Sequence, residues 1–107
     1  MTDYAYGVGD QVVAICWRGQ GAPEAEPHHR SWEVRILEAV QRGDKLVWKE
    51  SSKAVCAFWG DYSHIDQAKV RARVASDRAG LPYLLSADIG REVRSVEDEV
   101  IQALKEL

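Results

Sequence analysis

The sequence predicts an α+β fold in which a small, curved antiparallel sheet of three to four strands over residues 11–59 precedes two helices. The order follows from two patterns. Apolar residues between positions 11 and 60 favour the alternation of strands, whereas those between 63 and 107 favour helical spacing. A length of 107 residues is typical of one domain, so we expect a single domain over residues 1–107.

The strand predictions rest on β-branched and alternating apolar runs. Residues 11–17 form such a run behind a glycine-containing turn, and residues 32–40 alternate before the pattern breaks, which favours a bulge or bend. Gly43 is expected to supply the positive φ of a hairpin turn. Residues 46–48 and 54–59 complete a meander, to which residues 11–17 add a fourth strand. Small curved sheets with this spacing include SH3-like barrels.

The first helix is predicted over about residues 64–79. Ser63 is its expected N-cap, and Gly80 is expected to end it in the left-handed conformation. Because its apolar stripe is mostly alanine, we expect the helix to pack closely on its support. The stripe consists of Ile65, Ala68, Ala72, Ala75 and Ala79.

The second helix is predicted over about residues 95–106, with Ser95 as its N-cap. Residues 87–94 either extend this helix backwards or form a strand, and we prefer the shorter helix. Its apolar stripe either covers the sheet or pairs with the same stripe of a second copy in a homodimer. The stripe consists of Val96, Val100, Ala103, Leu104 and Leu107.

Composition restricts the class of protein. The formal net charge is −3, which disfavours a protein that coats duplex nucleic acid with basic side chains. No apolar run approaches the ~20 residues that span a bilayer, and residues 1–9 lack the features of a secretory signal. We therefore expect a cytoplasmic protein with no membrane partner. Cys16 and Cys56 are expected to be buried thiols, and a disulfide between neighbouring strands is the alternative in an oxidising compartment.

Residues 18–30 are rich in glycine, proline and polar side chains and are expected to form a flexible loop. Within it, His28 and His29 follow two glutamates and are weak candidates for metal ligands. Adjacent histidines point apart and a flexible loop does not preorganise a site, so we prefer a solvated loop. No cofactor is expected, because the sequence contains neither a phosphate-binding loop nor a CxxC pair.

His64, with Asp61 and Asp66 close by in sequence, has the residue types of a general base. Turn and cap roles for these three residues are the interpretation that we prefer. No nearby serine or cysteine completes the arrangement of an activated nucleophile. The sequence therefore predicts no catalytic residue.

All four tryptophans lie between positions 17 and 59. The alternation places Trp32 in the core, whereas Trp17 flanks the loop and is the best candidate for contact with a partner. Tryptophan, tyrosine and arginine are enriched where proteins bind each other. The predicted partner-binding residues are Trp17, Arg30, Trp48, Trp59, Tyr62, Lys69, Arg71 and Arg73.

These observations predict a non-catalytic interaction module that binds a protein or nucleoprotein partner. Small size, mild acidity and surplus aromatic residues also match the general profile of small phage-encoded inhibitors of host machinery. One alternative is a nucleic-acid-binding module that uses exposed tryptophans and the basic helix around Lys69, Arg71 and Arg73. The other is a small metal-dependent hydrolase.

Overall fold

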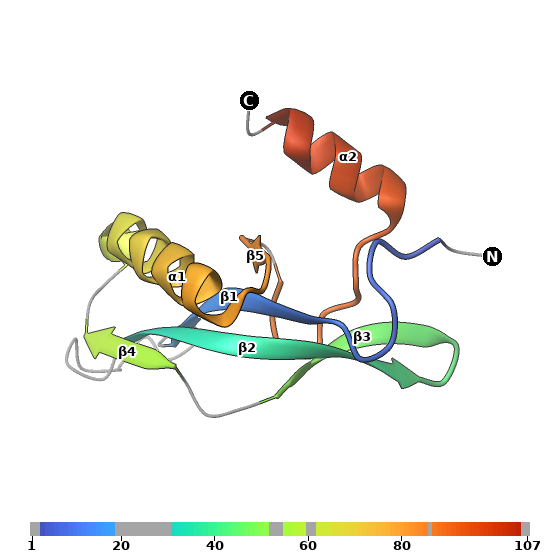
Figure 1. Cartoon of the computed structure of the whole chain (residues 1–107), viewed down its shortest axis with the longest axis horizontal. Coiled ribbons are helices and arrows are strands. Elements are labelled where there is room, and N and C mark those ends of the chain that lie inside the picture. Colours follow the sequence, from blue (N-terminus) through green and yellow to red (C-terminus); the bar gives the residue numbers. More distant parts are fainter. Residues whose placement is uncertain (1–2, 19–30, 52–54, 60–61, 86, 106–107) are drawn as a thin grey trace.

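The computed structural model describes residues 3–18, 31–51, 55–59, 62–85 and 87–105. It has the predicted α+β architecture (Figure 1). Four strands precede the first helix, and a short fifth strand of the same sheet lies between the two helices. The sheet is open and not closed into a barrel, so the SH3-like analogy does not hold. No helix in these ranges is long and apolar enough to cross a membrane.

The strands are β1 (Gln11–Arg18), β2 (Ser31–Arg42), β3 (Lys45–Glu50), β4 (Cys56–Trp59) and β5 (Tyr83–Leu84). Their order is β3-β2-β1-β5, and β4 also pairs with β2. β5 runs parallel to β1, so the sheet is mixed, whereas the sequence predicted an antiparallel one. The β2–β3 hairpin turns at Gly43, whose φ of 61° confirms the predicted positive φ.

β3 and β4 share one edge of β2. β3 pairs with residues 37–42 of β2, and β4 pairs with residues 31–34. Between these two stretches, the Ser51 N–H donates to the Ile36 carbonyl at 3.0 Å and the Val55 N–H donates to the Val34 carbonyl at 2.7 Å. β4 therefore continues the line of β3 toward the end of the sheet that carries the first helix.

The sequence favoured a bulge or bend in β2, and the described pairing of β2 contains no bulge. The pairing of β1 with β2 is continuous from Gln11 opposite Glu38 to Arg18 opposite Ser31. The alternation breaks because β2 changes the face that it buries: Trp32 and Val34 belong to one apolar cluster, and Leu37 belongs to another. The sheet is covered on one face at one end and on the opposite face at the other.

The two clusters lie on opposite faces of the central strand β1, since neighbouring strand residues point to opposite faces. Val12, Val13 and Ala14 are accordingly all fully buried. The first cluster, here the helix core, is Val13, Ile15, Trp32, Val34, Ala68, Ala72 and Ala75. The second, here the hairpin core, is Val12, Ala14, Leu37, Ala39, Leu46, Trp48, Leu84, Ala87 and Val93.

α1 (Ile65–Ala79) packs on the sheet through its alanines, and Ala68, Ala72 and Ala75 are buried as predicted. Of the other residues in the predicted stripe, Ile65 is half-buried and Ala79, the last residue of the helix, is exposed. The helix follows a 3₁₀ turn, η2 (Tyr62–His64), so its N-cap is His64. The prediction of Ser63 as the N-cap is wrong by one residue, because Ser63 lies inside that turn. The predicted end at Gly80 is confirmed.

Gly80→Ala is expected to lower the free energy of unfolding by about 1 kcal/mol, because Gly80 has a φ of 68° and a β-carbon is disfavoured there. Urea denaturation measures the loss. Gly80→Asn is the control, since asparagine tolerates this conformation better and should retain part of the lost stability. Equal stability of the alanine variant and the wild type would contradict the assigned helix end.

α2 (Val96–Lys105) begins where the sequence predicts, and the Asp98 N–H donates to the Ser95 hydroxyl oxygen at 3.1 Å. The segment before α2 is not helical, because Gly90 has a φ of 80°. It runs along the outer edge of β3 instead: the Trp48 N–H donates to the Arg91 carbonyl at 3.0 Å, and the Val93 N–H donates to the Leu46 carbonyl at 2.8 Å. The shorter of the two predicted helices is therefore confirmed.

Candidate interaction site

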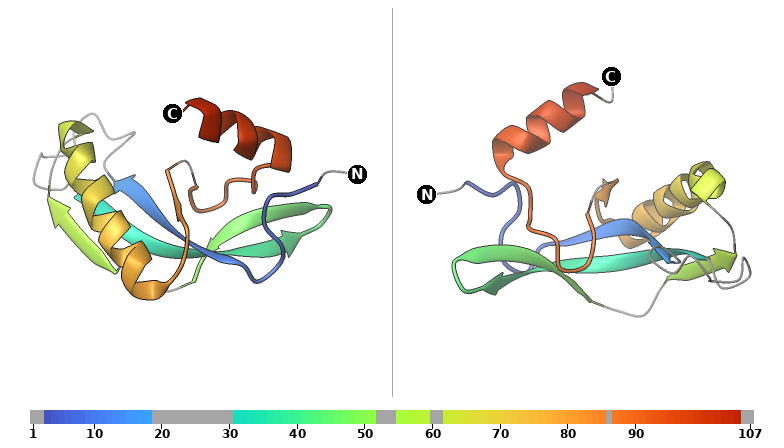
Figure 2. Two further views of the ribbon diagram at one scale, coloured as in Figure 1. Left: turned by 45° about the horizontal axis from the view of Figure 1, so that its top comes forward. Right: turned by 180° about the vertical axis from the view of Figure 1, so that it is seen from behind.

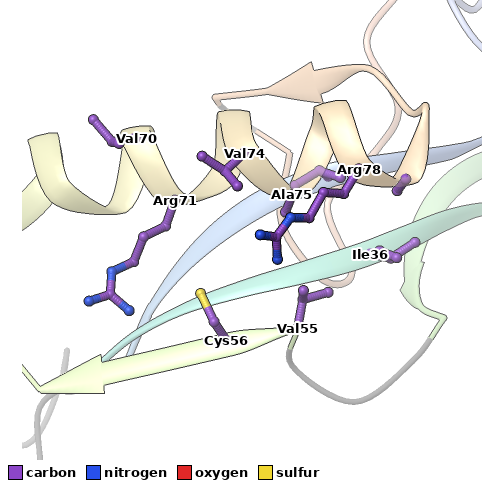
Figure 3. Close-up of a pocket in the computed structure, with 10 residues that line it drawn as sticks. Ile36, Val55, Cys56, Val70, Arg71, Val74, Ala75 and Arg78 are labelled. Atoms are coloured by element: carbon purple, nitrogen blue, oxygen red, sulfur yellow. The ribbon is translucent and has the colours of Figure 1, made fainter.

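A groove of about 460 Å³ lies between α1 and the strands β2 and β4 (Figure 3). We call it the α1 groove. Its buried and half-buried lining residues are Val13, Ile36, Cys56 and Ala75, and its exposed ones are Val55, Val70, Arg71, Val74, Arg78 and Ala79.

The lining is apolar although much of it is exposed to solvent. Val55, Val70 and Val74 are 51%, 63% and 46% exposed. Single exposed valines are ordinary, but three around one hollow form a patch of the kind that marks a binding surface. The alanine stripe holds α1 close to β1 and β2. Val70 and Val74 lie off that stripe on α1, and Val55 lines the groove from just before β4.

Two arginines add positive charge to the groove. Arg71 and Arg78 are seven residues apart, so they project from the same side of α1. Figure 3 shows both side chains extending from α1 toward β4. The Arg71 guanidinium lies 4.4 Å from the centre of the Phe58 ring, a cation–π contact that holds it at one end of the groove. Among the described residues that line the groove, none is acidic.

On the side of α1 that lies outside the groove, positive and negative side chains are equal in number. Asp66, Lys69, Arg73 and Asp77 follow one another at intervals of three or four residues, so they share one side of the helix. Two negative and two positive charges therefore lie there together. The net positive charge of α1 is concentrated at the groove.

The structure brings only part of the predicted site together. Arg71 lines the groove, whereas Lys69 and Arg73 do not. The prediction that Trp48 contacts a partner is wrong: its side chain is 2% exposed, because Tyr6 and the segment beside β3 cover it. The remaining predicted residues have side chains outside the part that the structure describes. They are Trp17, Arg30, Trp59 and Tyr62, together with the metal candidates His28 and His29.

Sequence reasoning missed the three exposed valines and Arg78. A pattern in the sequence of α1 indicates two of these valines. Val70 and Val74 are four residues apart and lie off the alanine stripe, next to Arg71 and Arg78. Apolar residues on a second side of a helix need a second partner, and here β4 leaves them uncovered.

Trp32 is 3% exposed, which confirms its predicted place in the core.

α2 carries a second exposed apolar surface, here the α2 face. It consists of Val96, Val100, Ile101 and Leu104, which are 47%, 55%, 51% and 63% exposed. No residue of Val96–Lys105 is buried. α2 stands apart from α1, above the end of the sheet formed by β3 (Figures 1 and 2). Its start is held where the Val96 N–H donates to the Asp3 carbonyl at 2.8 Å.

The described residues show little that is suited to covalent or metal chemistry. In the ranges that the structure covers, no three histidine, cysteine or acidic side chains form a group that could hold a metal ion. Cys16 pairs with Glu33, and Cys56 pairs with Val34. Because Glu33 and Val34 are consecutive residues of β2 and point to opposite faces, the two thiols also lie on opposite faces of the sheet. Neither forms a disulfide. His64, for which we prefer a turn or cap role over that of a general base, is the N-cap of α1.

Comparison with known proteins adds no relative: no family model, curated protein or solved structure matches the chain. The two exposed apolar surfaces are therefore the features of the molecule that indicate a function. Of these, the α1 groove has the more defined shape, because it is concave and carries two arginines from one side of α1.

Proposed function

We propose that the protein is a non-catalytic interaction module that binds an acidic, amphipathic helix of a protein partner in the α1 groove. The observation that carries this proposal is the combination of three exposed valines with Arg71 and Arg78 around one concave surface. Apolar side chains that fill the hollow would supply affinity, and carboxylates that pair with the arginines would orient the bound segment.

The shape of the groove favours a helix of a few turns. The residues of α1 that line it extend from Val70 to Ala79, a length of about 15 Å at the rise of an α-helix. A helix of that length presents apolar side chains at intervals of three and four residues. Val70 and Val74 of α1 and Val55, just before β4, would pack between those side chains.

The charge distribution favours a protein over a nucleic acid. Phosphate contacts draw on many cations along one surface, but Lys69 and Arg73 share their side of α1 with two aspartates. Trp48, one of the tryptophans proposed to stack on bases, is buried. The two hypotheses differ in which arginines contact the partner. Among the arginines that the structure describes, Arg71 and Arg78 line the groove and Arg73 does not.

Selection of helical peptides from a displayed library against the wild-type protein tests the proposal. We expect the enriched peptides to combine an apolar stripe with acidic residues. Arg71→Glu or Val74→Asp should weaken their binding at least about tenfold, a change of about 1.4 kcal/mol. Fluorescence anisotropy measures the dissociation constants, and added salt should weaken the binding.

Arg73→Glu is the matched control, since it makes the same charge change on α1 outside the groove. It should leave peptide affinity within about twofold of the wild type because exposed charges away from the contact contribute little. Equal loss from Arg73→Glu and Arg71→Glu, together with salt-sensitive binding of single-stranded oligonucleotides, would favour the nucleic-acid alternative. Enriched peptides that bind Val74→Asp as well as the wild type would contradict the proposal.

A further inference from the structure

The chain itself carries a helix of the kind that the α1 groove fits. We infer that α2 of one copy occupies the α1 groove of a second copy, so that the protein associates with itself. This inference rests on the proposed function, because it names the helix that the groove binds. Three properties of α2 support it: its length, its apolar stripe and its charge.

Length and stripe agree with the groove. α2 has 10 residues, which span about 15 Å, close to the length of α1 that lines the groove. Val96, Val100 and Leu104 follow one another at intervals of four residues, so they form one row along the helix. All three are exposed. Seated in the groove, this row would cover the exposed valines of α1.

The charges of the two surfaces are opposite. The first turn of α2 contains Glu97, Asp98 and Glu99. Glu99 is already paired with Arg94 at 3.2 Å, whereas Glu97 is exposed beside the apolar row. Arg71 and Arg78 at the groove supply the complementary cations. Carboxylate–guanidinium pairs of this kind fix the orientation of a docked helix.

The contact has to form between copies. Backbone hydrogen bonds attach the start of α2 to the N-terminal segment, where the Ala5 N–H donates to the Arg94 carbonyl at 2.9 Å. This junction lies at the end of the sheet away from β4 (Figures 1 and 2). A helix anchored there stands apart from α1 of its own chain. Its exposed face is therefore presented outward to another molecule.

Sedimentation velocity across a range of protein concentrations tests the inference with two variants. Val100→Asp damages the α2 face, and Val74→Asp damages the groove. We expect the wild type to self-associate and each variant to raise the dissociation constant at least about tenfold. A mixture of the two variants should associate again, because the intact helix of one can enter the intact groove of the other. Circular dichroism checks that both variants are folded.

Val8→Asp is the matched control, because Val8 is 68% exposed and belongs to neither surface. It should associate like the wild type. A wild type that stays monomeric at every concentration overturns the inference, and so does association that survives either variant or fails to return in the mixture. If the wild type is monomeric and selected peptides still bind its groove, the proposed function holds and only the inference that α2 occupies the groove is wrong.

Discussion

Trp48→Ala is expected to lower the free energy of unfolding by about 3–5 kcal/mol, the usual cost of removing a buried tryptophan. Its side chain is 2% exposed inside the hairpin core. The Tyr6 ring packs edge-on against it, with the ring centres 5.6 Å apart. Domains of this size have total stabilities of about 5–15 kcal/mol, so the variant should lose a large share of the folded state.

Urea denaturation followed by far-ultraviolet circular dichroism measures this loss. Lys49→Ala is the control, because Lys49 is the exposed neighbour of Trp48 and its replacement should change stability by less than about 0.5 kcal/mol. Trp48→Phe should lose less than Trp48→Ala, since it retains an aromatic ring. A Trp48→Ala variant as stable as Lys49→Ala would place this ring on the surface and restore it as a partner-binding candidate.

Ala72→Leu is expected to lower the free energy of unfolding by about 1–3 kcal/mol through overpacking. Ala72 is fully buried where α1 packs on the sheet. A leucine there has to push the helix away from β1 and β2, because the side chain cannot turn toward solvent. The same shift would widen the α1 groove, so the variant should also bind groove peptides more weakly.

Val74→Leu is the matched control for this substitution. It adds volume to the same helix at a position that is 46% exposed, so stability should change by less than about 0.5 kcal/mol. Differential scanning calorimetry compares the two variants directly. If Ala72→Leu proves as stable as Val74→Leu, the close packing of α1 on the sheet is contradicted.

The elements that were predictable from the sequence are those with a strong local pattern. The alanine stripe of α1, the glycine at its end and the serine before α2 each act through neighbouring residues, and each is confirmed. Residues 83–86 are predictable as a short extended segment, but the pairing of β5 with β1 is not, because β5 has two residues and no local pattern shows a parallel pairing.

The face switch in β2 and the α1 groove depend on contacts between distant segments. The break after Ile36 has two explanations in the sequence, a bulge or a change of buried face. The continuous pairing with β1 excludes the bulge, and the burial of Leu37 in one cluster with Leu84 and Val93 shows the change of face. Likewise, Val70 and Val74 become a site only because β4 lies beside them. Pairing of β4 with the first residues of β2 places it there.

Alkylation of Cys56 measures the occupancy of the α1 groove directly, because this thiol lines the groove (Figure 3). Cys16, the other cysteine of the chain, is 2% exposed and should react only after unfolding, which makes it an internal control. The rate of Cys56 modification by iodoacetamide is measured with and without a saturating peptide selected on the protein. The proposed function predicts that the peptide slows this reaction at least about tenfold, while a scrambled peptide does not. An unchanged rate under saturating peptide would show that the protein binds its partner elsewhere.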